Sequence, residues 1–173
     1  MTRAEETALI FKIKEGDKNL FRQVVDSHGG MIFSVLYRMT GSREDAEDLA
    51  QETFVKAYFS LGQFRGDSSI STWLYSIAYR LAVSSLRKKK LTVNREKFSE
   101  EELRQSASLL ESGDDTEMKE LREKQYEALE KAVAELEPQD RFLIAAFYEQ
   151  GRSIADLAGI TGLTPANVKV KLY

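Results

Sequence analysis

The sequence predicts an all-α protein of two small helical domains joined by a flexible acidic linker. Along most of the chain the apolar residues recur at spacings of three and four, and the alternation typical of β-strands is nearly absent. From Leu91 to about Thr116 the apolar residues thin out, and acids, serine and glycine replace them. We therefore expect domains at residues 1–90 and 117–173, with residues 91–116 as the linker.

The composition of the 173 residues argues against most classes of enzyme. The chain has no cysteine and a single histidine, so it offers no thiolate chemistry and almost no stock for a catalytic triad or a histidine-bound metal. We expect no enzymatic activity, no metal and no cofactor. No apolar run approaches the length of a membrane span, and the start lacks the apolar core of a signal peptide. A cytoplasmic protein is the simplest interpretation.

Three helices are predicted in the first 41 residues. Apolar residues up to Ile13 indicate a first helix that ends at Gly16. Asp17 is expected to cap a second helix, which stops near the glycines of residues 27–30. A third apolar stripe runs from Met31 to Met39 and is closed by Thr40 and Gly41.

The fourth predicted helix has an acidic outer face. Ser42 is expected to cap it, and its inner face reads from Ala46 to Leu61 at steps of three and four. Asp48, Gln51 and Glu52 lie beyond the first turn and share one side. That side is either a docking surface for a basic partner or an ordinary solvated acidic face.

The stretch from residue 64 to residue 90 combines a loop with a basic helix. Gly66 suits a positive φ, and a helix should begin near Ser69. Between Asp67 and Glu96 there is no acidic residue. The side chains that share one side at steps of four, four and three are Ser76, Arg80, Ser84 and Arg87, with Tyr79 beside them. That side can face DNA, although the pattern alone fits a core helix with a solvated basic end equally well.

The second domain ends in a predicted helix-turn-helix. Pro138 is expected to open one helix, and Ser153 to start the next. Thr164 then caps a last helix that buries Val168 and Leu172. The residues left for a major groove are Pro165, Ala166, Asn167, Lys169 and Lys171. A plain helical hairpin has the same pattern.

Four motifs in this order resemble one family. They are DAEDLAQETFVKAY from Asp45, FRGDSSISTWLYSIAYRLAVSSLRKKK from Phe64, the acidic linker, and LEPQDRFLIAAFYEQGRSIADLAGITGLTPANVKVKL from Leu136. Together they cover nearly the whole chain and are similar to the extracytoplasmic-function sigma factors of bacterial RNA polymerase. The resemblance implies a sigma-two and a sigma-four domain, with core polymerase, promoter DNA and an anti-sigma factor as partners.

The resemblance also implies roles for individual residues. Asp48, Gln51 and Glu52 match the stretch that docks on the clamp helices of the largest polymerase subunit. The loop from Phe64 to Ile70 matches the segment that captures a flipped base of the promoter's minus-ten element. Expected minus-ten contacts are Phe64, Arg65, Asp67, Ser69, Ser76, Tyr79, Arg80, Arg87 and Lys88. Expected minus-thirty-five contacts are Thr164, Pro165, Ala166, Asn167, Lys169 and Lys171.

The chain departs from the family pattern in two places. Members usually continue the last helix with an arginine-rich turn, so we expect the natural chain to extend beyond Tyr173. Asp156 stands where a glutamate is more usual. Two other functions remain open from sequence alone: a stand-alone helix-turn-helix transcription regulator, and a phosphotransfer protein that uses His28.

Overall fold

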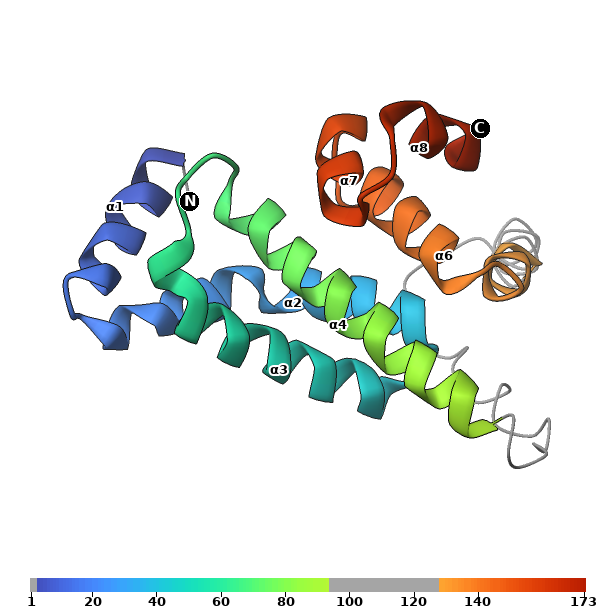
Figure 1. Cartoon of the computed structure of the whole chain (residues 1–173), viewed down its shortest axis with the longest axis horizontal. Coiled ribbons are helices and arrows are strands. Elements are labelled where there is room, and N and C mark those ends of the chain that lie inside the picture. The colour runs from blue at the N-terminus through green and yellow to red at the C-terminus, as the bar shows by residue number, and fades with distance from the viewer. Residues whose placement is uncertain (1–2, 94–127) are drawn as a thin grey trace, which may run out of the picture.

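The first domain is a helical bundle with one further helix at its end (Figure 1). A computed structural model of the chain describes residues 3–93 and 128–173, so the predicted linker lies almost entirely outside the described residues. The elements of the first domain are α1 (Arg3–Lys14), a 3-10 turn (Lys18–Leu20), α2 (Phe21–Thr40), α3 (Arg43–Ser60), a second 3-10 turn (Leu61–Gln63) and α4 (Ile70–Val93). Helices α2, α3 and α4 pack against one another.

The second domain begins, in its described part, with a helical stretch at residues 128–134. It continues with α6 (Pro138–Ile144), a π-helical turn (Ala145–Glu149), α7 (Ile154–Thr161) and α8 (Pro165–Leu172). The described ranges contain helices and turns only, which confirms the all-α prediction. None of the described helices combines the length and the apolar character that a bilayer crossing requires.

Capping residues begin the helices where the sequence places them. The Ser42 hydroxyl accepts a hydrogen bond from the Asp45 amide, and Thr164 does the same for Asn167. Pro138 occupies the first turn of α6. Gly41 and Gly162 end α2 and α7 at positive φ (68° and 77°).

The predicted break at residues 27–30 is wrong, because α2 runs through it without interruption. One buried stripe, which includes Val24, His28 and Ile32, continues across both glycines at steps of four. Each glycine weakens a helix by about 1 kcal/mol, and burial of this stripe outweighs that cost. Asp17 makes no side-chain cap, because a 3-10 turn stands between it and α2.

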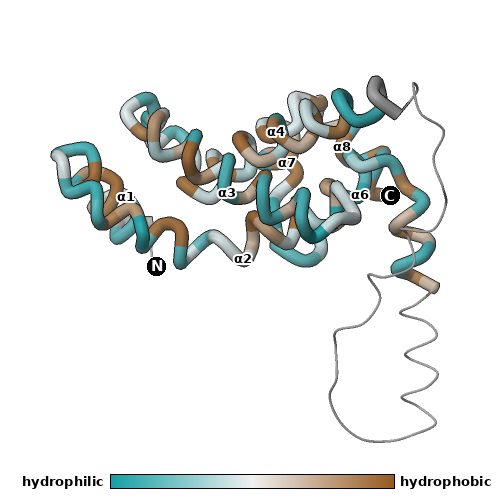
Figure 2. Tube along the Cα trace, turned by 90° about the horizontal axis from the view of Figure 1, so that it is seen from below, coloured by the Kyte–Doolittle hydropathy of each residue, from teal (hydrophilic) through white to brown (hydrophobic). Residues whose placement is uncertain are grey.

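The two domains lie against each other. Helix α6 packs on α2 and α4, and α7 packs on α4, so one apolar core runs through both domains. Figure 2 shows both hydrophobic and hydrophilic residues along the helix tubes, as expected for amphipathic helices that bury one face.

Candidate nucleic-acid interface

The acidic residues of α3 form an exposed row on the outer face of the bundle. Asp48, Gln51 and Glu52 are all exposed. None of the ion pairs found among residues 5–90 and 128–173 involves Asp48 or Glu52. By contrast, Asp45 near the start of the helix pairs with Lys89 of α4 at 2.6 Å. The two acids of the row therefore remain available to a cationic partner.

Sequence reasoning missed an apolar continuation of this row. Val55 and Phe59 follow Asp48 and Glu52 at helical spacing, and their side chains are 56% and 81% exposed. Because the two lie one turn apart on one face, they form an adjacent apolar pair rather than single scattered residues. The signal in the sequence was a phenylalanine outside the buried stripe of its helix. We define Asp48, Gln51, Glu52, Val55 and Phe59 as the α3 row.

The loop between α3 and α4 is held in one conformation by its own residues. Gly66 has a φ of 80°, which favours glycine. The Ser69 hydroxyl accepts from the Thr72 amide and so caps α4, which begins where the sequence predicted. The rings of Phe64 and Trp73 lie with their centroids 5.2 Å apart, so Trp73 anchors the start of the loop to the helix that follows it.

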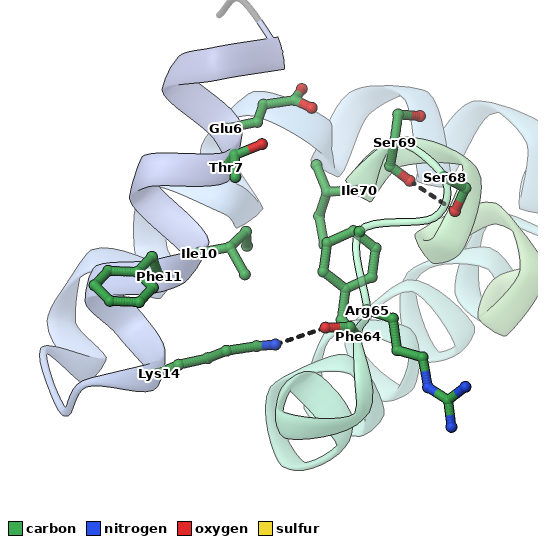
Figure 3. Close-up of a pocket in the computed structure, with 11 residues that line it drawn as sticks. Glu6, Thr7, Ile10, Phe11, Lys14, Phe64, Arg65, Ser68, Ser69 and Ile70 are labelled. Atoms are coloured by element: carbon green, nitrogen blue, oxygen red, sulfur yellow. Dashed lines mark hydrogen bonds between the residues drawn. The ribbon is translucent and has the colours of Figure 1, made fainter.

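Helix α1 forms the other wall of a cleft beside this loop. Figure 3 shows Lys14 reaching from α1 to Phe64, where its Nζ donates to the backbone carbonyl at 2.6 Å. Arg65 points away from α1 in the same view. The cleft is lined by Glu6, Thr7, Ile10, Phe11, Lys14, Phe64, Arg65, Gly66, Ser68, Ser69 and Ile70. The sequence indicated the loop but not the contribution of α1, because the two segments lie about 50 residues apart in the chain.

On the side of α4 that was expected to face DNA, some side chains are exposed and others are buried. Arg80, Arg87 and Lys88 are exposed, as a phosphate-binding surface requires. Ser76 and Tyr79 are buried, with 8% and 7% of their surface exposed. The Ser76 hydroxyl donates to the Thr72 carbonyl of its own helix at 3.0 Å. In this arrangement of the two domains, neither side chain is open to DNA.

The second domain is what covers Tyr79. Its ring lies 4.8 Å from the Phe142 ring of α6, and its hydroxyl accepts from Gln139 Nε2 at 2.7 Å. Burial raises the pKa of Tyr79, and the hydrogen bond from Gln139 only partly opposes that effect. Tyr79 is therefore a neutral side chain at the domain contact.

Arg152, before α7, makes the main polar contact between the domains. Its guanidinium lies 4.9 Å from the centre of the Tyr75 ring, and Nη1 donates to Ser71 Oγ at 2.9 Å. Nearby, Thr72 donates to Asp156 of α7 at 3.4 Å. Within the described residues, Arg152 Nε is buried without a hydrogen-bond partner.

A second cluster of charges joins α2 to the second domain. Arg38 of α2 lies 3.1 Å from Glu149 and 3.5 Å from Glu130. All three side chains are at least one-third exposed, so solvent screens the pairs. These ion pairs therefore contribute little to the free energy of the domain contact.

The helix-turn-helix buries Val168 as predicted, whereas Leu172 is only half-buried, and its outer surface is exposed. Leu157, Ile160 and Val168 are buried between α6, α7 and α8. All six expected minus-thirty-five residues are exposed. Two of them already have partners inside the domain, because the Thr164 hydroxyl caps α8 and Lys171 Nζ lies 2.5 Å from Asp140.

The phosphotransfer reading of His28 is contradicted by its burial. Only 5% of its surface is exposed, and neither ring nitrogen has a hydrogen-bond partner within the described part of the chain. Glu6 Oε1 lies 3.8 Å from Nε2, too far for a hydrogen bond. Burial, and then the charge of Arg152, lowers the pKa of His28 from 6.5. The ring is a neutral core group that a phosphoryl donor cannot reach.

Models of two protein families together match most of the chain. Residues 24–92 match Sigma-70 region 2, and residues 126–173 match Sigma-70, region 4. Among curated relatives, the ECF RNA polymerase sigma factor SigW of Bacillus subtilis is 42% identical over 81 residues, which are 47% of this chain and 43% of that protein. The RNA polymerase sigma-H factor of Pseudomonas aeruginosa is 38% identical over 86 residues, which are 50% of this chain and 45% of that protein. Each match therefore spans less than half of the relative's own length.

Solved structures share the fold at low sequence identity. RpoE of Bartonella quintana, solved with the anti-sigma factor NepR, superposes with a TM-score of 0.69 at 22% identity and covers 88% of this chain and 89% of that one. CnrH, solved with the cytosolic domain of CnrY, gives a TM-score of 0.64 at 18% identity, with 96% and 89% covered.

Proposed function

Since the chain belongs to the sigma-70 family and is of the extracytoplasmic-function type, we propose that it directs RNA polymerase to promoters. In this role it is a dissociable subunit that brings core polymerase to a specific DNA sequence and traps the melted strand. It breaks no covalent bond itself, and it works in the cytoplasm. The observation that carries the proposal is the presence of both sigma-70 regions on one chain, each with an exposed surface suited to its task.

Docking on core polymerase is the role we propose for the α3 row. Its acidic half suits a basic helical element such as the clamp helices of the largest subunit. Its apolar half, Val55 and Phe59, supplies the desolvated contact area that charge pairs alone do not provide. The exposure of both halves on one helix face supports this assignment.

Capture of the minus-ten element is the role we propose for the loop at residues 64–70 and for α4. The cleft beside Phe64 combines an aromatic ring with serine hydroxyls and the Lys14 ammonium, which suits an extruded base. Arg80 and Arg87 of α4 would contact the backbone of the captured strand. The contact proposed for Tyr79 requires the second domain to leave α4 first. Ser76 is also buried in the arrangement described and would have to become exposed before it could contact DNA.

Recognition of the minus-thirty-five element is the role we propose for α8. In a helix-turn-helix the second helix enters the major groove. An anti-sigma factor is a further proposed partner, since both structural neighbours described above were solved with proteins bound to them, one of which is named as an anti-sigma factor. A partner that stabilises the contact between α4 and α7 would keep this chain inactive.

The test is transcription by purified core polymerase with and without this chain. On a supercoiled library of bacterial genomic DNA, we expect start sites that appear only when the chain is added and that share two upstream elements. The competing function, a stand-alone helix-turn-helix regulator, predicts specific binding of duplex DNA without polymerase. Specific binding by the chain alone, together with no new start sites, would reject our proposal.

A further inference from the structure

An exposed apolar side chain lies at the centre of the surface that α8 turns to solvent. Val170 has 80% of its surface exposed, whereas Val168, two residues earlier on the same helix, is fully buried. At 100° per residue, Val170 lies opposite Val168, and Ala166 lies one turn before it on the same outward line. Ala166 is exposed as well.

Polar and charged side chains border this apolar pair. Lys169 lies on one side of it, and Asn167 and Lys171 lie on the other. All three are exposed, and Lys171 is also tied to Asp140 of α6. Lysines on both sides of a helix can reach the two phosphate backbones that border a major groove. The apolar pair would then point at the floor of that groove.

The chemistry of the groove limits what an apolar side chain can read there. Guanine, cytosine and adenine present hydrogen-bonding atoms, and only thymine presents a methyl group. A valine against the hydrogen-bonding edge of another base would leave that edge desolvated and unpaired. We propose that Val170, supported by Ala166, reads the C5 methyl group of a thymine in the upstream promoter element. This inference rests on the proposed function and adds the identity of one base to it.

The experiment uses the full chain bound to core polymerase and duplex DNA with eight randomised base pairs. The selected sequence is then made again with deoxyuridine in place of one thymine at a time, which removes only the methyl group. We expect one replacement to weaken binding about fourfold, the equivalent of one buried methyl group. At that position, Val170→Ala should bind the thymine and uracil probes equally.

Two control variants separate base reading from general weakening. Lys169→Ala should weaken binding to the thymine and uracil probes by the same factor and lower the salt dependence. Leu129→Ala removes another exposed aliphatic side chain of this domain (58% exposed) and should leave the methyl dependence intact. Because Val170 is exposed, Val170→Ala should unfold at the same temperature as the parent chain.

The outcomes distinguish this inference from the proposed function. Selection of a sequence with no methyl dependence at any thymine overturns the inference alone. The same conclusion follows if Val170→Ala keeps the methyl dependence. If no sequence is selected at all, the proposed function fails and the inference fails with it.

Discussion

Replacing Arg152 with alanine should shift the two domains from the closed arrangement toward an open one. The substitution removes a cation–π contact at 4.9 Å from the Tyr75 ring and a hydrogen bond of 2.9 Å to Ser71. A partly desolvated cation–π contact contributes about 1 kcal/mol, and the charged hydrogen bond about 1.5 kcal/mol. The buried Arg152 Nε, which has no partner in the described structure, is removed too and offsets part of this loss. The expected net change is about 1 to 2 kcal/mol, or about a five- to thirtyfold rise in the open-to-closed ratio.

The lack of native cysteine makes this shift measurable by fluorescence energy transfer. Dyes on the exposed positions Lys56→Cys in α3 and Glu135→Cys in the second domain report the distance between the domains. Arg80→Ala is the matched control, since Arg80 is an exposed arginine of α4 with no polar contact found to residues 128–173. An Arg152→Ala chain with the same transfer efficiency as the Arg80→Ala chain would refute the reasoning.

Three further predictions concern other parts of the chain. The double variant Asp48→Lys, Glu52→Lys should abolish copurification with core polymerase. Phe59→Ser should weaken the affinity for core polymerase about thirtyfold, as expected for a central contact. Phe11→Ser, at a comparably exposed phenylalanine of α1 (61%), should leave that affinity unchanged. Arg80→Ala and Arg87→Ala should each reduce permanganate reactivity of the melted promoter while core binding is unchanged, and unaltered footprints would count against the assignment. His28 has a lowered pKa in the folded chain, so the unfolded chain binds a proton at His28 first as the pH falls below 6.5. The parent chain should therefore lose up to about 1.4 kcal/mol of unfolding free energy per pH unit relative to His28→Gln, as measured by urea titration. If the stability of the two proteins changes in parallel with pH, proton uptake by His28 does not contribute to the pH dependence.

Local chemistry could be read from the sequence, and so three helix starts were predicted correctly, whereas the start assigned to Asp17 was not. Ser42, Ser69 and Thr164 each satisfy a backbone amide at the start of a helix, which depends only on residues within the next three positions. Gly66 and Gly162 take the positive φ that turns require. None of these features needs a distant partner to form.

Features that depend on tertiary contact were the ones that sequence reasoning missed. The glycine pair within α2 suggested a break, but its neighbours Val24, His28 and Ile32 are buried by other helices. Helix propensity is a weak term, and packing decides between one helix and two. The contribution of α1 to the cleft beside Phe64 escaped notice for the same reason, since nothing local indicates that Lys14 reaches that carbonyl.

The burial of Tyr79 follows from the same physics, and it has a consequence for function. The hydrophobic periodicity of the sequence indicates which side of α4 is apolar, but not which part of the protein packs on that side. Here Phe142 and Gln139 of the second domain cover Tyr79 of α4, which we propose as a minus-ten contact. DNA and the second domain then compete for one surface.

Such competition couples DNA affinity to the domain contact in a calculable way. If only a fraction of the molecules is open, the apparent dissociation constant for minus-ten DNA rises by the inverse of that fraction. A contact that favours the closed form by about 2 kcal/mol therefore weakens DNA binding about thirtyfold. The opposite holds for Arg152→Ala, which should strengthen binding of single-stranded minus-ten DNA by up to the factor by which it opens the domains. The same variant thus tests both the domain contact and the surface that the contact hides.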